Sequence, residues 1–244
     1  MDFSDLESAL ALPLAEDTSL DTAAVGVLAT LASFVTPLAG IVLVGYVVRL
    51  VRAGGRTTTA LPAFDEFGGV VVDGVRLSGV LVALQLPAVG IAVAVAKLAG
   101  ASFATLVYAA EMQSLHVVGH SVLVVVGLVA AGGAALVGTY FSAAATVAVA
   151  RERSLVAAVP TTRELASDMS FVPVVSAVAL VVFAGRLLAA LFGALPLVGS
   201  VLAALVSFFA LVASAALLGR GASKLAAHDS ASRPDSTVDA VGSA

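Results

Sequence analysis

The stretch from Gly45 to Arg76, GYVVRLVRAGGRTTTALPAFDEFGGVVVDGVR, carries one hydrophobic segment into a group of arginines and then leads into a second hydrophobic segment. Loops that follow membrane-spanning segments are enriched in Lys and Arg on the cytoplasmic side of the bilayer. The side on which this loop lies therefore decides how the rest of the chain is arranged.

The composition is that of a protein surrounded by lipid. Of the 244 residues, 60% are hydrophobic and 11% are charged, against about 25% charged in an ordinary soluble domain. The mean hydropathy is +1.11, and the apolar runs exceed the roughly 18 residues that distinguish a membrane span from a buried core helix. Because these runs are continuous and not alternating, the predicted fold class is all-α, a polytopic helical membrane bundle.

Five transmembrane helices are predicted, at about residues 23–48, 77–96, 121–150, 174–192 and 197–218. They form a transmembrane domain over 22–226, between an acidic leader (1–21) and a disordered polar tail (227–244). Pro37 should kink the first span, because proline removes a backbone donor. Residues 98–119 are apolar but interrupted by polar residues, and the sequence does not place them.

Short amphipathic helices are predicted at the membrane interface in both arginine-bearing loops. In the first loop, apolar residues share one helical face: Leu61, Phe64, Phe67, Val71 and Val75. Gly68 and Gly69 favour a bend there, because glycine is a poor helix former. In the second loop, Thr161 and Glu164 have the spacing of a capping box.

The basic residues indicate the orientation in the membrane. With five spans, only Lys97 and Arg186 of the 12 basic residues fall outside the arginine-bearing side. The positive-inside rule then predicts a plasma-membrane protein with its N-terminus outside and its C-terminus in the cytoplasm.

Two candidate functional residues lie within the predicted spans. Gln85, near the middle of the second span, should face other helices. Arg186, in the fourth span, is an ionisable residue inside the membrane and by default a candidate functional residue. Its alternative role is to snorkel, with the charged group reaching the headgroup region.

The first loop also offers a polar candidate site, made of Asp65, Glu66, Asp73 and Arg76. It would face the cytoplasm, and the second loop has charged residues to pair with it: Arg163, Glu164 and Asp168. The alternative is that these charges are the water-facing side of an interfacial helix.

Several functions lack their sequence signature. The chain has no cysteine, and no catalytic triad, P-loop or dinucleotide motif, so we expect no enzyme. His116 and His120 share a helical face near Glu111, as zinc ligands or a lipid-acting enzyme would require, but without a general-base motif, and no metal or cofactor is expected. The net charge of -4 argues against nucleic acid as a partner.

Two classes of function remain. The first is a non-enzymatic protein that acts by helix packing or by binding a membrane-protein partner or a second copy of itself. Small residues that let helices approach closely in lipid favour it: Gly127, Ala131, Ala135, Gly138 and Ser142 in the third span, and Ser200, Ala204, Ser207, Ala210 and Ser214 in the fifth. The second is a transporter or permease subunit with a mid-membrane polar cavity lined by Gln85. Helices that are broken at Pro37 and Pro87 would favour this class, because transporter sites often use discontinuous spans.

Four short segments resemble a known family: Gly45 to Arg49, Pro62 to Phe67, Val72 to Gly74 and Leu218 to Gly221. They are similar to a haloarchaeal multi-pass membrane family known only as a domain of unknown function. The resemblance covers about residues 9–226, with Phe67 where the family usually has Trp. It implies a helical membrane fold and a salt-loving archaeal source, and it implies no activity.

Overall fold

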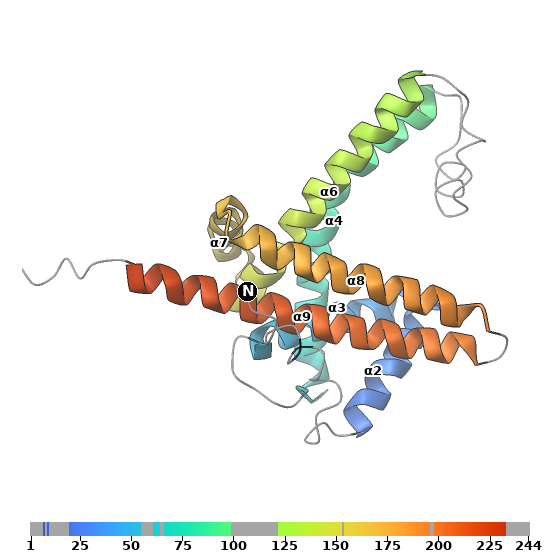
Figure 1. Ribbon diagram of the computed structural model, residues 1–244, viewed down its shortest axis with the longest axis vertical. Helices are drawn as coiled ribbons and strands as arrows, with labels where there is room; N and C mark the ends of the chain where they lie inside the picture. The colour runs from blue at the N-terminus through green and yellow to red at the C-terminus, as the bar shows by residue number, and fades with distance from the viewer. Residues whose placement is uncertain are drawn as a thin grey trace, which may run out of the picture.

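The computed structural model describes Glu7, Ala9 and residues 20–54, 61–63, 66–98, 122–152, 154–195 and 198–232. All the elements in these residues are α-helices, which confirms the predicted fold class (Figure 1). They are α2 (Leu20–Ser33), α3 (Pro37–Gly54), α4 (Phe67–Leu98), α6 (Val122–Arg151), α7 (Leu155–Ser167), α8 (Phe171–Gly193) and α9 (Gly199–Ser232).

Five of the described helices are long and apolar enough to cross a membrane: Pro37–Gly54, Phe67–Leu98, Val125–Arg151, Phe171–Gly193 and Gly199–His228. A helix of about 20 residues spans the roughly 30 Å of bilayer hydrocarbon. The number of spans therefore agrees with the prediction, and the chain has the architecture of a multi-pass membrane protein.

The helices pack in two pairs around α3. Helix α8 packs on α9 and α4 packs on α6, while α3 contacts α4, α6 and α9. In Figure 1 the α4–α6 pair and the α8–α9 pair diverge from a common region beside α3 and α7. Tyr46 of α3 lies in this region, where its ring stacks on Phe208 of α9 with centroids 6.2 Å apart. Its hydroxyl donates to the carbonyl oxygen of Pro62 at 3.0 Å.

Two glycines set how closely α3 and α4 approach. A Cβ added to Gly45 would overlap the carbonyl oxygen of Val70, and one added to Gly74 would overlap the carbonyl oxygen of Ile41. The two backbones therefore touch, which only glycine allows at both positions. This contact joins the first two turns of α4 to the first half of α3, and the antiparallel course of the two helices brings Glu66 beside Arg49, nearer the end of α3.

The first predicted span was wrong in its bounds. Instead of one kinked helix over 23–48, the structure has α2 and α3 with a break at residues 34–36, and Figure 1 shows the two helices running in different directions. Pro37 is the first residue of α3, a position where its missing N–H costs nothing. Helix α2 has 14 residues, about 21 Å, and is too short to cross the hydrocarbon, so α3 is the first span.

The interfacial helix predicted in the first loop is not a separate element. Helix α4 is continuous from Phe67, through both glycines that were expected to bend it. Its buried residues there are Val70, Gly74 and Leu77, whereas Phe67, on the predicted apolar face, is 60% exposed. The backbone contact with α3 decides which face is buried and overrides the amphipathic pattern.

The short helix predicted in the second loop is present as α7, but it starts before the predicted cap. Ser154 is its N-cap, and the Ser154 side chain accepts a hydrogen bond from the backbone nitrogen of Ala157 at 3.1 Å. Thr161 lies inside the helix, where its hydroxyl donates to the carbonyl oxygen of Ala157. The predicted Thr161–Glu164 capping box was therefore wrong, because the helix begins earlier and the Ser154 side chain accepts the hydrogen bond from its first turn.

The two ends of the chain are described only in part. Helix α9 extends to Ser232, so residues 227–232, predicted as tail, are helical. In the leader, Ala9 is fully buried in the core cluster that contains Tyr46. The rest of the predicted tail, and the candidate metal residues Glu111, His116 and His120, lie outside the described residues.

Candidate functional site

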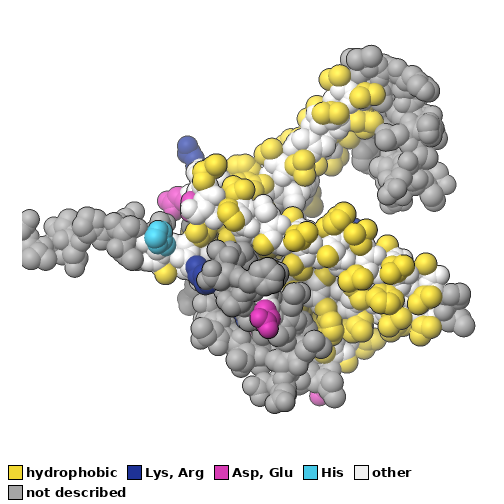
Figure 2. Space-filling view, in the orientation of Figure 1, with side chains coloured by type: hydrophobic (Ala, Val, Ile, Leu, Met, Phe, Trp, Pro, Cys, Tyr) yellow, Lys and Arg dark blue, Asp and Glu magenta, His cyan; other side chains and the backbone are white. Residues whose placement is uncertain are grey.

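The arginine-bearing ends of α3, α6 and α9 are joined by hydrogen bonds. Arg52 Nε donates to the carbonyl oxygen of Ala150 at 2.9 Å, and Arg151 Nη2 donates to that of Ala222 at 2.7 Å. Ala150 lies in the last turn of α6, where carbonyls lack intrahelical partners and favour a positive charge, whereas Ala222 lies inside α9. In the view of Figure 2 several charged side chains lie around α7 and the C-terminal part of α9, and hydrophobic side chains cover much of the α4–α6 and α8–α9 pairs.

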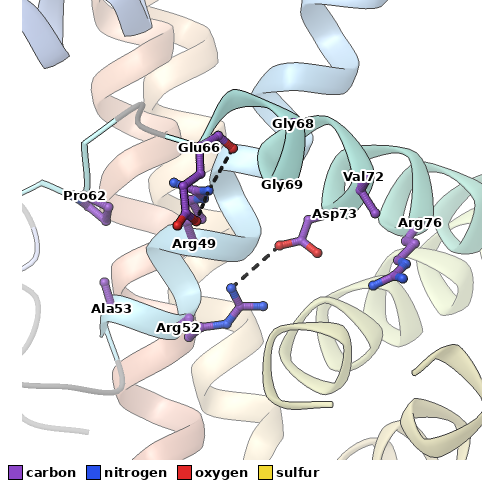
Figure 3. A pocket seen from close by; sticks show the side chains of 10 residues that line it. All are labelled: Arg49, Arg52, Ala53, Pro62, Glu66, Gly68, Gly69, Val72, Asp73 and Arg76. Atoms are coloured by element: carbon purple, nitrogen blue, oxygen red, sulfur yellow. Dashed lines mark hydrogen bonds and ion pairs between the residues drawn. The ribbon is translucent and has the colours of Figure 1, made fainter. Parts of the chain in front are cut away.

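A cavity of about 560 Å³, here called the arginine cleft, opens between the end of α3 and the beginning of α4. Figure 3 shows its lining residues: Arg49, Arg52, Ala53, Pro62, Glu66, Gly68, Gly69, Val72, Asp73 and Arg76. Three of the predicted site residues, Glu66, Asp73 and Arg76, are thus brought together. Asp65 lies outside the described residues.

Two ion pairs cross the arginine cleft from α3 to the first turns of α4. Arg49 Nη2 lies 3.4 Å from Glu66 Oε2, and Arg52 Nη1 lies 3.6 Å from Asp73 Oδ2. The Glu66 side chain is 84% exposed, so water screens its pair, and a pair of this kind contributes at most about 1 kcal/mol. The Asp73 side chain is only 20% exposed, so its pair with Arg52 is the better shielded of the two.

Glu66 turns the chain sharply into α4. Its φ of 53° lies in the left-handed region, which costs a non-glycine residue on the order of 1 kcal/mol or more. Its carbonyl oxygen accepts hydrogen bonds from the amides of Gly69 at 2.8 Å and Val70 at 3.3 Å. Arg49 Nη2 donates to the same oxygen at 3.1 Å. These three donors hold the strained residue, and they keep Glu66 facing Arg49.

Arg76 is the arginine of the arginine cleft that forms no ion pair across it. It is exposed and forms no ion pair with any residue that the structure describes. Figure 3 shows Asp73 lying between Arg52 and Arg76. With three arginines against two carboxylates, the described lining carries a net charge of +1.

The second loop reaches this site through its first residues. A small cavity of about 10 Å³ is lined by Asp73 and Arg76 together with Val149, Glu152, Ser154 and Leu155. The predicted partners Arg163, Glu164 and Asp168 line neither this cavity nor the arginine cleft. They belong to α7 and the residue after it, and α7 packs mainly on α6.

Gln85 faces another helix, as predicted. Its Nε2 donates to Thr139 Oγ1 at 3.4 Å, and Thr139 in turn donates to the carbonyl oxygen of Ala135 at 2.8 Å. A Cβ added to Gly138 would lie 2.9 Å from Gln85 Oε1. The amide therefore packs against the backbone of α6, and it lines neither cavity described above.

Arg186 stands apart from the arginine cleft. It is exposed on α8, and it forms no ion pair with a described residue. Its neighbour Gly185 is buried, because Ala210 of α9 occupies the space beside it. This placement suits a side chain that reaches along the outside of the helix, and it gives Arg186 no described partner for chemistry.

Sequence reasoning missed Arg49 and Arg52 as site residues, because they served only to mark the side of the membrane. They supply the partners of both carboxylates in the arginine cleft. One signal was present: residues three apart share a helical face, so Arg49 and Arg52 had to point the same way from the end of α3.

The small-residue face predicted in the third span packs against α4. A Cβ added to Gly127 would collide with the side chain of Val95. A Cβ added to Gly138 would lie 2.8 Å from the carbonyl oxygen of Leu84. Gly132 and Gly133, on another side of α6, have no atom within 4 Å of the position of a Cβ. Helix α6 therefore carries small residues both where α4 covers it and where no described residue does.

These observations define a multi-pass helical membrane protein with a basic cleft at one end of its spans. The chain belongs to the family described as Protein of unknown function (DUF4013), whose family model matches residues 28–194. This confirms the resemblance to a domain of unknown function, over a shorter range than the predicted 9–226. No curated protein and no solved structure matches the chain.

Proposed function

We propose that this chain is a non-enzymatic membrane protein that acts by association within the bilayer, and that its partner is a second copy of itself. The interface is the outer face of α6, defined by Val129, Gly132, Gly133, Leu136 and Val137. The three large residues of this face are exposed, Val129 to 70% and Leu136 to 74%.

The observation that carries the proposal is that two adjacent glycines of α6, Gly132 and Gly133, both face open space, whereas the open glycines Gly79 and Gly90 of α4 stand singly. Glycine costs a helix about 1 kcal/mol relative to alanine. At Gly45 and Gly138 a neighbouring helix comes close enough to offset this cost, but no described helix does so beside Gly132 and Gly133. Lipid chains do not require glycine, whereas close helix approach in a membrane does.

A second copy is the partner that this face fits best. A twofold axis brings one surface patch against the same patch of another molecule. The glycine pair lies between exposed Val129 and exposed Leu136, so two α6 helices that cross at the glycines would each place these apolar side chains beside the other helix.

The absence of cysteine makes a direct test possible, because one substituted cysteine is then the only thiol. We expect Val129→Cys in native membranes to form a covalent dimer on mild oxidation. The matched control is Leu191→Cys on α8, whose parent side chain is 68% exposed, close to the 70% of Val129. Adding Gly133→Leu to Val129→Cys should reduce the dimer at least about tenfold. Equal cross-linking at both cysteines, or no effect of Gly133→Leu, would contradict the proposal.

The state of the described carboxylates supports the non-enzymatic part of the proposal. Glu66 and Asp73 each form an ion pair with an arginine, so neither is an isolated carboxylate facing the arginine cleft. The packing of Gln85 against Gly138 likewise favours association. The transporter alternative, which needs a polar cavity at Gln85, stays a prediction.

The proposal includes the plasma membrane as location, the arginine-bearing ends in the cytoplasm, the N-terminus outside, and no nucleic-acid partner. The positive-inside rule supports this orientation, since Arg49, Arg52 and Arg76 line one cleft. An excess of acidic over basic residues, 16 against 12, supports a salt-loving archaeal source.

The orientation can be measured with single cysteines and a membrane-impermeant thiol reagent on intact cells. Val35→Cys, at the 88% exposed position between α2 and α3, should react. His228→Cys, near the end of α9, should react only after the cells are opened. The reverse pattern would invert the proposed topology.

A further inference from the structure

We infer that the arginine cleft binds a phosphate group, and that its source is the headgroup of an anionic phospholipid in the leaflet at the arginine-bearing ends of the spans. This site is separate from the outer face of α6, so it does not depend on self-association. Four features of the arginine cleft carry the inference: its charge, its preorganised donors, the open space at the first turn of α4, and its position.

The charge of the arginine cleft favours an anion. The described lining is net positive, and Arg76 forms no ion pair with a described carboxylate, although Asp73 and Glu152 line a small cavity with it. A metal cation would meet three guanidinium groups, which disfavours it. A phosphate group instead matches the planar fork of N–H donors that a guanidinium presents.

The donors are held in place before any ligand arrives. The hydrogen bond from Arg52 Nε to Ala150 fixes the plane of the Arg52 guanidinium at the end of α6. The Arg52 side chain is nevertheless 42% exposed, so N–H groups that do not meet Ala150 or Asp73 remain accessible from the cleft. A fixed fork loses less conformational freedom when it binds, because its rotamer is already chosen.

The first turn of α4 adds open space beside the arginines. Among the described residues, no neighbouring atom lies within 4 Å of a Cβ position at Gly68, and only Arg49 Nη2, at 3.3 Å, approaches that of Gly69. The positive end of a helix dipole lies at this turn, and it reinforces the attraction of the arginines for an anion. Bulkier side chains at these two positions would fill the space that we assign to the phosphate.

The position of the arginine cleft favours a lipid as the source of the phosphate. The cleft lies where α3 ends and α4 begins, at the end of two spans. Its volume of about 560 Å³ falls in the range of small-molecule sites, roughly 300 to 1,000 Å³. Val72, which lines it, is 48% exposed and offers an apolar surface to the chains below a headgroup.

The test is native mass spectrometry of the full purified chain, released from vesicles of phosphatidylcholine with one tenth phosphatidylglycerol. We expect phosphatidylglycerol to be retained in preference to phosphatidylcholine. Arg76→Gln should lower its retention about tenfold, and because Arg76 is exposed and without a described partner, this variant should fold normally. Arg186→Gln, which removes an exposed arginine elsewhere, is the matched control and should retain the lipid unchanged.

Asp73→Asn gives a second variant with the opposite expected sign. Asp73 lies between Arg52 and Arg76 (Figure 3), so its negative charge repels a bound phosphate, and its removal should raise retention about threefold or more. A residue that only supported the fold would not improve binding when replaced. Equal retention in the Arg76→Gln and Arg186→Gln variants, or weaker retention in Asp73→Asn, would overturn the inference.

Competition with inorganic phosphate distinguishes the two sources of the phosphate group. For a lipid site, millimolar phosphate should leave the bound phosphatidylglycerol in place, because the acyl chains add contacts that the free ion lacks. Complete displacement by millimolar phosphate, lost in Arg76→Gln, would overturn the lipid source and assign the arginine cleft to a soluble phosphate compound.

Discussion

The backbone contact between α3 and α4 predicts that Gly74→Ala destabilises the protein although alanine is the better helix former. The new Cβ would overlap the carbonyl oxygen of Ile41 and lie 3.1 Å from the nitrogen of Gly45. Neither atom can move by a rotamer change, because both belong to the backbone of α3, so the two helices must separate. Overpacking of this kind costs up to about 3 kcal/mol, and the gain in helix propensity offsets about 1 kcal/mol of it. The expected net loss is therefore about 2 kcal/mol.

Gly79→Ala is the matched control in the same helix. No neighbouring atom of the described residues lies within 4 Å of a Cβ at Gly79, so only the propensity term applies and this variant should be up to about 1 kcal/mol more stable than the parent. The difference between the two variants, about 3 kcal/mol, isolates the helix contact.

The assay is unfolding of the purified chain in mixed micelles by increasing sodium dodecyl sulfate, followed by far-ultraviolet circular dichroism. Gly74→Ala should unfold at a lower fraction of dodecyl sulfate than the parent, and Gly79→Ala at an equal or higher fraction. Equal midpoints for the two variants would refute the close approach of α3 and α4. The arginine cleft, which both helices line, would then lose its structural basis.

Three further outcomes follow from named hydrogen bonds. Tyr46→Phe removes the hydroxyl that donates to the carbonyl oxygen of Pro62 and should cost about 1 kcal/mol in the same dodecyl sulfate titration; no change would mean that water takes the place of the hydroxyl as donor to Pro62. Ser154→Ala removes the cap that the amide of Ala157 donates to and should cost about 1 kcal/mol, measured as faster amide hydrogen exchange in the first turn of α7 but not in α8. Gln85→Leu should change the stability by only about 0.6 kcal/mol, the average for a hydrogen bond between membrane helices, and a loss of several kcal/mol in the titration would show a larger polar network at Gln85.

The proposed self-association interface and the proposed lipid site lie in different regions of the α4–α6 pair. The arginine cleft lies at the beginning of α4, close to the end of α6 through Arg52 and Ala150. The outer face of α6, with Gly132 and Gly133, lies further from that end, where Figure 1 shows the α4–α6 pair extending away from the α8–α9 pair. Cross-linking and lipid retention therefore report on different surfaces, and either proposal can fail without the other.

The sequence alone determined the all-α class, the number of spans, the short helix now seen as α7, and the joint placement of Glu66, Asp73 and Arg76. Each of these features depends on local properties of the sequence: the length of an apolar run, its hydrophobicity and its flanking charges. These properties can be read without knowing which other helices pack against the run. The candidate site was predictable for the same reason, because its residues lie within one short stretch of the chain.

Only the tertiary structure decided which face of α4 is buried, that Pro37 starts a helix instead of kinking one, and that Arg49 and Arg52 hold the carboxylates of Glu66 and Asp73. These features depend on how closely two helices approach, and that distance is set jointly by Gly45 and Gly74 on different helices. An amphipathic pattern describes one helix at a time. Such a pattern contains no information on a contact between the backbones of two helices. For that reason the buried face of α4 is the one that α3 covers and not the predicted apolar face.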